Sequence, residues 1–211
     1  MSDTGIEALL MRPGTYGLPP GAEIERIETH ASLVFLAGDR AYKLKKSVDL
    51  GFLEFTTLEK RRVACERELA LNRRTAPGIY LGLVPVRRAA KGLVLGGDDG
   101  ETVEWLVEMR RFPADGLFAR MAEEGRLTRA HIEMLAADIE RFHRLAELRR
   151  DRGGAGTFAR IVAGSDENLR DSLGRVFDAD DVSRLRETSD RAIARLTPLL
   201  DARRARGFVR Q

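Results

Sequence analysis

The chain has 211 residues, of which 43% are hydrophobic, 33% charged and 6% aromatic, so it is long enough for one large domain or two small lobes with a packed core. Its 36 Lys and Arg residues are nearly balanced by 33 Asp and Glu residues, which argues against a dedicated nucleic-acid-binding protein. A single cysteine and three histidines exclude an internal disulfide and argue against a structural zinc site.

Short strands around one helix are predicted for the N-terminal half. In chain order, the apolar pattern predicts a short helix at 6–11 halted by Pro13, a strand at 23–29, paired strands at 32–38 and 40–46, a strand at 79–86, and a hairpin within 93–112 whose loop is 96–100. Gly38 and Asp39 form the expected turn between the paired strands. The returning strand carries three lysines, Lys43, Lys45 and Lys46.

The helix among these strands is predicted over roughly residues 54–74. Thr56 or Thr57 is its candidate N-cap, and Pro77 with Gly78 ends the segment. Glu68 shares one helical face with Arg61, Cys65 and Asn72, whereas Glu66 points elsewhere. We expect Cys65 to be a small core residue and not a nucleophile.

Beyond Pro113 the composition predicts helices only. A helix at 128–148 begins at Thr128 and carries an apolar face on which His143 is expected as a hydrogen-bonded core histidine. A polar, Gly-rich loop at 149–158 and helices near 166–176 and 180–205 follow. The chain is therefore predicted to have an α+β fold of two lobes, residues 1–112 and 113–211, with a ligand cleft between them.

Six blocks within residues 23–148 resemble one family. In order they are ETHASLVFL, AYKLKK, GFLEF, CERELALNRR, APGIYLGLVPV and VEMRRFP. They resemble the small lobe of protein-kinase-like enzymes, and more specifically the aminoglycoside-phosphotransferase-like family, in the bacterial group whose domain precedes a P-loop ATPase domain. The resemblance implies a protein-kinase-like fold, with a β-rich N-lobe that contains one helix and a partial, all-helical C-lobe.

The lysines of the returning strand gain a role from this resemblance. Period-two alternation puts Lys43 and Lys45 on the same side of the strand. The resemblance implies that one of them holds the phosphates of ATP and that Glu68 orients it. The AYK run at 41–43 favours Lys43, and the YKLK run at 42–45 keeps Lys45 as a near equal. The alternatives are a solvated strand face, and a surface pair between Glu68 and a nearby arginine.

Two further nucleotide contacts are implied by the resemblance. The turn from Thr29 to Ser32 occupies the place of the phosphate-covering loop, where the Ser32 hydroxyl and backbone N–H groups would bind phosphate. It lacks G-x-G-x-x-G, and an ordinary turn with a capping hydroxyl is the alternative. The hinge between the lobes falls at 108–113, with backbone groups of Met109, Arg110 and Phe112 at the adenine edge.

The family's catalytic loop, H-G-D-x-H-x-x-N, and its later Asp are missing from the sequence, as is a G-x-x-x-x-G-K-[ST] motif. The family draws its base and its Mg²⁺ ligands from that loop and that Asp. The chain ends at RARGFVRQ, where the loop is expected to begin, so we interpret it as a truncated piece whose Mg²⁺ ligands lie beyond its C-terminus. By itself it is expected to bind ATP only weakly, because the Mg²⁺ ligands are missing, and not to catalyse phosphoryl transfer.

Three functions follow from this interpretation, in order of preference. The first is the ATP-binding part of a small-molecule phosphotransferase of unassigned substrate, in the cytoplasm. The second is a non-catalytic nucleotide-sensing or docking module for an attached P-loop ATPase domain. The third, based on the arginine-rich tail at 203–210, is an RNA-associated protein, against which the interspersed Asp and Glu residues argue.

Overall fold

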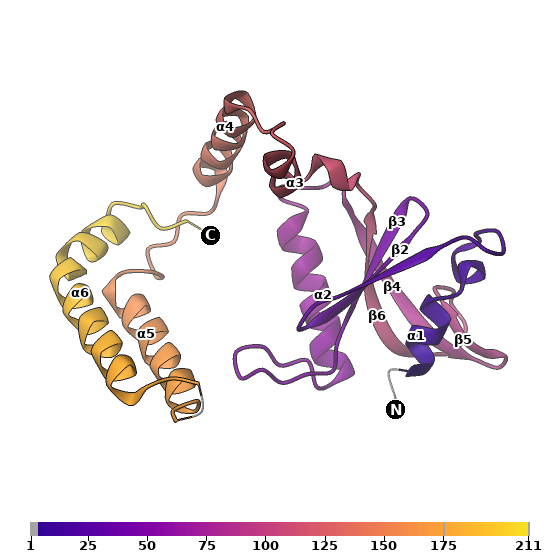
Figure 1. Ribbon diagram of the computed structural model, residues 1–211, viewed down its shortest axis with the longest axis horizontal. Coiled ribbons are helices and arrows are strands. Elements are labelled where there is room, and N and C mark those ends of the chain that lie inside the picture. Colours follow the sequence, from indigo (N-terminus) through magenta and orange to yellow (C-terminus); the bar gives the residue numbers. More distant parts are fainter. Residues whose placement is uncertain (1–3, 175, 211) are drawn as a thin grey trace. The chain divides into compact units, whose positions relative to one another are not determined.

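The structure is a computed structural model that describes residues 4–174 and 176–210 (Figure 1). It contains two compact units, Met1–Leu127 and Thr128–Gln211, which we call unit 1 and unit 2. The boundary lies later in the chain than the one expected after Phe112, because the short helices η2 (Ala114–Gly116) and α3 (Phe118–Glu123) group with unit 1.

Unit 1 is built on a six-stranded antiparallel sheet with the strand order β1-β2-β3-β6-β4-β5. The strands are β1 (Ile24–Glu28), β2 (Ser32–Ala37), β3 (Arg40–Lys45), β4 (Tyr80–Ala89), β5 (Gly92–Leu95) and β6 (Glu101–Arg110). The predicted α+β class is therefore confirmed, as is the hairpin turning at Gly38 and Asp39, where Gly38 takes the left-handed φ of 58° that a tight turn requires.

The hairpin predicted within residues 93–112 is wrong in its pairing. β5 pairs with β4 through a short turn at Ala90 and Lys91, and β6 crosses over to lie between β3 and β4. The reason is the length of β4, which continues past Val86 to Ala89 and so meets β5 directly. The five residues from Gly96 to Gly100 then carry the chain across the sheet.

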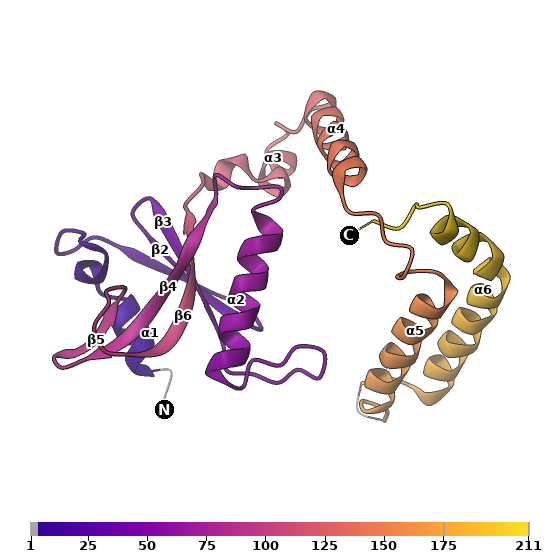
Figure 2. The same cartoon turned by 180° about the vertical axis from the view of Figure 1, so that it is seen from behind.

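Helices cover the two faces of the sheet, as Figures 1 and 2 show from opposite sides. On one face, α1 (Thr4–Leu10) and the 3-10 helix η1 (Pro13–Tyr16) pack on a core centred on Phe35, Leu10 and Leu106, all fully buried. On the other face lies α2 (Leu58–Asn72), packed against β6 and β4. The Thr57 hydroxyl begins α2 by accepting a hydrogen bond from the Lys60 backbone N–H at 3.2 Å, as one of the two predicted caps requires.

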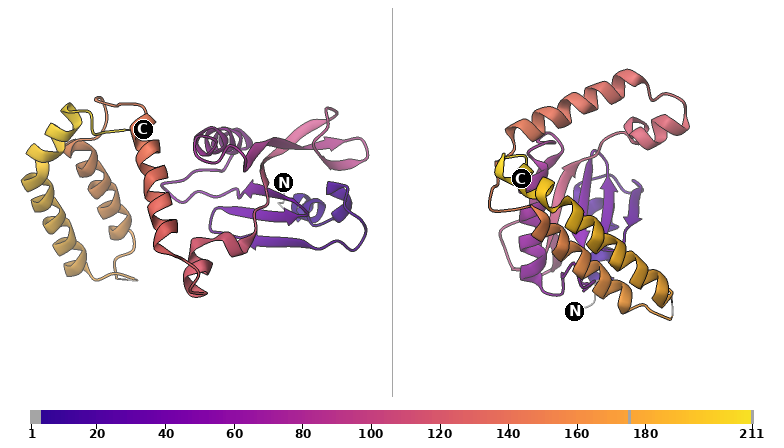
Figure 3. Two further views of the ribbon diagram at one scale, coloured as in Figure 1. Left: turned by 90° about the horizontal axis from the view of Figure 1, so that it is seen from above. Right: turned by 90° about the vertical axis from the view of Figure 1, so that its left-hand side faces the viewer.

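Unit 2 consists of α4 (Arg129–Leu145), α5 (Ala155–Arg170) and α6 (Ala179–Ala205), of which α5 and α6 pack side by side (Figure 3). At the start of α4, His131 Nδ1 accepts a hydrogen bond from the Thr128 backbone N–H at 3.1 Å, a role for this histidine that the sequence did not suggest. Much of the predicted apolar face of α4 is exposed, and His143 is an exposed residue and not a core histidine.

The helix expected near 166–176 begins earlier and ends sooner than predicted. α5 starts at Ala155, inside the segment assigned to a Gly-rich loop, because Asp201 on α6 supplies a cap from a distant part of the chain. Its Oδ1 accepts a hydrogen bond from the Ala155 backbone N–H at 3.2 Å. Gly153 and Gly154, both with φ of 73°, turn the chain into the helix.

Within the described residues, none of the helices combines the length and the apolar character needed to cross a bilayer.

Candidate functional site

Both predicted lysines of β3 contact the predicted glutamate of α2. Lys43 Nζ donates to Glu68 Oε1 at 2.9 Å, and Lys45 Nζ donates to Glu68 Oε2 at 2.6 Å. The lysines share one face of β3 because side chains alternate along a strand, and α2 packs on that face. Neither alternative holds, because the lysines do not form a purely solvated face and Glu68 is not paired with an arginine of its own helix.

The two lysines differ in what surrounds them. The Lys45 side chain is 7% exposed, and its ammonium group lies over the Phe55 ring, 5.0 Å from the ring centroid. The Lys43 side chain is 29% exposed. Lys45 is therefore held between a carboxylate and an aromatic ring, whereas Lys43 retains a side open to solvent.

The site carries more positive than negative charge, with two ammonium groups on one carboxylate. Burial by itself would raise the pKa of Glu68, but the hydrogen bonds from Lys45 and Lys43 outweigh it, so the pKa of Glu68 is lowered. Burial and the Glu68 charge raise the pKa of the nearby Tyr80 phenol. Glu68 thus stays ionised and neutralises one of the two ammonium groups.

Lys43 lies in an apolar row that crosses the sheet. The strand register places Ile27, Val34, Lys43 and Val107 side by side on four neighbouring strands. Ala41 lies beside this row on the same face of β3, and Ile27 is 42% exposed at the sheet's edge. The partly exposed Lys43 is therefore flanked by apolar side chains, of which Ala41 and Val107 are buried.

An open groove borders the same cluster at Lys45 and Glu68. It has a volume of about 620 Å³ and is lined by Lys45 and Glu68, by α2, and by the residues between β3 and α2, including Phe52 and Phe55. Cavities of this size are typical of small-molecule sites.

Ser32 lies at the predicted turn, but its surroundings differ from those of an open phosphate loop. The residue is only 4% exposed, and its register partner on β3 is Lys45. The capping hydroxyl belongs to Thr29, whose Oγ1 accepts from the Ser32 N–H and donates to the Ser32 carbonyl, each at 3.0 Å. The Ser32 N–H is therefore used within the turn.

The predicted hinge residues lie at the end of β6 and just beyond it, since Met109 and Arg110 are the last two residues of the strand. Met109 pairs with Ala41 on β3 and with Tyr80 on β4. The Arg110 N–H donates to the Ile79 carbonyl at 2.8 Å, and the Arg111 N–H donates to the Asp39 carbonyl at 2.9 Å. Both amides are thus engaged in the fold, and the half-exposed Phe112 comes next.

A buried ion pair between Arg61 and Glu104 stabilises the elements that carry the site, and it was not predicted from the sequence. Arg61 Nε and Nη2 each contact Glu104 Oε2 at 2.8 Å, and Arg61 Nη1 donates to the Phe55 carbonyl at 2.9 Å. Glu104 is 2% exposed. The pair ties α2 to β6 and fixes the residue whose ring covers Lys45. One feature of the sequence could have indicated the pair: Glu104 interrupts the apolar run of β6, and Arg61 lies on the helical face of α2 that also carries Cys65.

Cys65 completes the sheet-facing side of α2. It is fully buried, its Sγ lies 3.9 Å from the Trp105 carbonyl oxygen, and burial raises its pKa to about 11. The thiol is therefore protonated at neutral pH, and the prediction of a core residue is confirmed. Within the described part of the chain, no group of three or more His, Cys, Asp or Glu side chains could hold a metal ion.

Comparison with known proteins finds long relatives of undetermined activity. The chain is 32% identical over 185 residues to the uncharacterized protein Rv2004c of Mycobacterium tuberculosis (strain H37Rv) and, to the same degree, to the uncharacterized protein Mb2027c of Mycobacterium bovis. Each match covers 86% of this chain and 35% of the relative, so the chain spans about a third of their length. No model of a known protein family matches, and no solved structure matches.

Proposed function

We propose that unit 1 is the nucleotide-binding lobe of an aminoglycoside-phosphotransferase-like, protein-kinase-like small-molecule kinase. The observation that carries the proposal is the pair of strand lysines held by one helix carboxylate. The blocks that resemble this family include both partners, Lys43 and Lys45 in AYKLKK and Glu68 in CERELALNRR. The acceptor molecule is left open.

The surplus positive charge and the apolar neighbours of Lys43 support ATP as the ligand. A triphosphate needs surplus positive charge, which the second ammonium group supplies. A base needs an apolar surface beside the phosphates, and we assign this contact to the half-buried Val34, the register partner of Lys43. The N–H groups of Arg110 and Arg111 are already hydrogen-bonded within the fold. We therefore take the next amide, that of Phe112, as the candidate donor to the adenine edge.

Between the lysines, we assign phosphate binding to Lys43 and positioning of Glu68 to Lys45. Lys43 has the exposed side, whereas Lys45 is enclosed by Glu68 and Phe55. When bound, ATP supplies the phosphoryl group, and Mg²⁺ would shield its charge. The proposal assigns the Mg²⁺ ligands and the catalytic base to other parts of the parent protein, which we expect in the cytoplasm.

Lysine acylation with and without nucleotide tests this proposal. ATP should protect Lys43 from acylation and leave Lys46 unprotected, because Lys46 pairs with Glu28 and does not contact Glu68. Lys43→Gln should weaken ATP binding by about tenfold or more, whereas Lys46→Gln should leave it within about twofold. Equal labelling of Lys43 in the presence and absence of ATP would remove the nucleotide site.

The second candidate, a nucleotide-sensing or docking module for a P-loop ATPase domain, uses the same lysine cluster. Like the first candidate, it rests on the two strand lysines that share one helix carboxylate. A phosphotransferase assay on the full-length parent protein separates the two. ATP binding without phosphoryl transfer to any acceptor, water included, would favour the module.

A further inference from the structure

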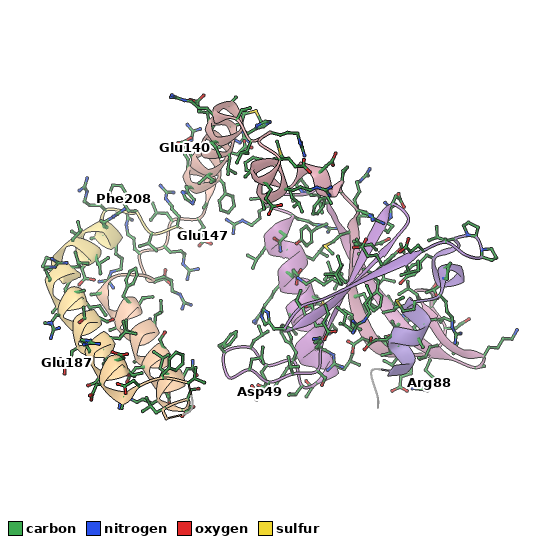
Figure 4. All side chains as sticks on the ribbon, viewed as in Figure 1. Asp49, Arg88, Glu140, Glu147, Glu187 and Phe208 are labelled. Atoms are coloured by element: carbon green, nitrogen blue, oxygen red, sulfur yellow. The ribbon has the colours of Figure 1, made fainter. Side chains whose placement is uncertain are left out.

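A cleft rich in arginine lies in unit 2, between the C-terminal half of α4 and the end of α6. We call it the arginine cleft. It has a volume of about 980 Å³, and its charged and aromatic lining comprises Arg144, Arg203, Arg206, Arg210, Glu140, His143 and Phe208. Figure 4 labels Glu140 on α4 and Phe208 just beyond α6. All lining residues belong to unit 2.

The segment that forms one wall is held in place by the chain before α5. The Arg149 N–H donates to the Val209 carbonyl at 3.0 Å, Arg210 Nη1 donates to the Ala146 carbonyl at 3.2 Å, and Leu148 forms an isolated bridge with Arg210. Residues 207–210 are thus tied to the linker after α4. The cleft is therefore a built feature of the unit and not a chance gap beside a free tail.

The charge of the cleft is strongly one-sided. Four arginines face one glutamate, which leaves a formal charge of +3, the same as the net charge of the whole chain. Arg144 contacts Glu140 at 3.4 Å. Arg203 and Arg206 lie over the Phe208 ring at 5.6 Å and 5.1 Å from the ring centroid. No carboxylate partner of these two is present among the described residues, whereas most arginines of α5 and α6 pair with a neighbouring acid.

An ordinary structural role explains part of this charge. Basic residues in the last turn of a helix interact favourably with the helix dipole, and α6 ends at Ala205 while α4 ends at Leu145. Each helix end contributes roughly half a negative elementary charge. The two ends together therefore offset only about one of the three positive charges, and the remainder is free to attract an anion.

We propose that the arginine cleft binds a small phosphorylated molecule that has an apolar portion. Arginine forks recognise phosphate through paired N–H groups, and the cleft offers them from both walls. Ile139 and Phe208 supply apolar surface beside them, and the volume suits a compact ligand. A nucleic-acid strand is disfavoured because Arg184, Arg186 and Arg191, farther along α6, are paired with neighbouring acids, so the unpaired positive charge does not continue as a stripe along this helix. The site is independent of the proposed nucleotide lobe.

Calorimetric titration of the 211-residue chain tests this proposal, with inorganic tripolyphosphate and phenyl phosphate as probes. A Lys43→Gln background removes the proposed nucleotide contact, so that failure of one proposal leaves the other standing. Arg203→Gln with Arg206→Gln, and separately Arg144→Gln on the opposite wall, should each weaken tripolyphosphate binding by about tenfold or more. Arg141→Gln, on α4 outside the cleft and paired with Asp138, is the matched control. Phenyl phosphate should bind more tightly than inorganic phosphate.

Three results would overturn the proposal. One is tripolyphosphate affinity that is unchanged in both cleft variants. Another is an equal loss in the Arg141→Gln control, which would indicate a diffuse charge effect. The third is binding of an oligouridine about tenfold tighter than that of tripolyphosphate at the same salt concentration, with this binding abolished in the same variants. That result would identify a nucleic-acid surface. Thermal melts of each variant verify that the unit remains folded.

Discussion

The Glu104→Gln substitution should destabilise unit 1 severely, because it leaves a buried guanidinium without its counter-charge. Glu104 is 2% exposed and receives hydrogen bonds from Arg61 and from the Trp105 backbone N–H, the latter at 2.9 Å. Glutamine preserves the size of the side chain but not its charge, and its amide group cannot accept from both sides. Removing one partner of such a pair costs about 3–5 kcal/mol.

Urea unfolding followed by tryptophan fluorescence measures this loss, since Trp105 is the chain's one tryptophan and lies next to Glu104 in unit 1. With a dependence of about 1–3 kcal/mol per molar urea, the midpoint should fall by roughly 2 M. Glu101→Gln, at the exposed start of β6, is the matched control and should change stability by less than about 0.5 kcal/mol. Joint replacement by Arg61→Met and Glu104→Leu should recover most of the loss. A cost below about 1 kcal/mol for Glu104→Gln would refute the reasoning.

Three further predictions concern the same unit. The pKa of Glu68 is lowered from 4.5, so its ionised form stabilises the fold above that pH, and this stabilisation is lost as the pH falls through the folded pKa. The wild-type free energy of unfolding in urea should therefore exceed that of Glu68→Gln by less and less below about pH 4.5. A difference between the two that stays constant with pH would contradict this prediction. Cys65, with its pKa raised to about 11, should react with a thiol-specific disulfide reagent at pH 8 only after denaturation, and prompt reaction of the native chain would count against its burial. Gly38→Ala should lower the free energy of unfolding by about 1 kcal/mol or more, because φ is 58° at this position and the new Cβ would lie 3.2 Å from Leu18 Cδ2. An unchanged urea midpoint would argue against that turn geometry.

The lysine–glutamate cluster was predictable because it depends on local periodicity. Alternation along one strand places Lys43 and Lys45 together, and the helical repeat places Glu68 on the same face as Cys65. These periodicities are properties of a strand and of a helix and do not depend on tertiary contacts with the rest of the chain. The sharing of one carboxylate by both lysines was not predictable, because it depends on the distance between β3 and α2.

The errors arose where distant residues decide the structure. Strand pairing depends on which edge a segment meets, so nothing in residues 93–112 reveals that β6 joins β3 and not β5. The early start of α5 depends on Asp201, far along the chain, which caps a segment whose glycines favour a loop. Arg61 and Glu104 are separated by 43 positions and meet only once the sheet has formed.

The position of β6 determines the order in which unit 1 can be assembled during synthesis. β3 is complete at Lys45, but its second neighbour begins only at Glu101, so a nascent chain holds an unpaired strand edge until the intervening residues have emerged from the ribosome. Closure of such sequence-distant pairs is slow. Before β6 has emerged, the ammonium groups of Lys43 and Lys45 on β3 would repel the same two groups on another nascent chain. The lysines that we assign to the ligand site would therefore also oppose association of two unpaired β3 edges.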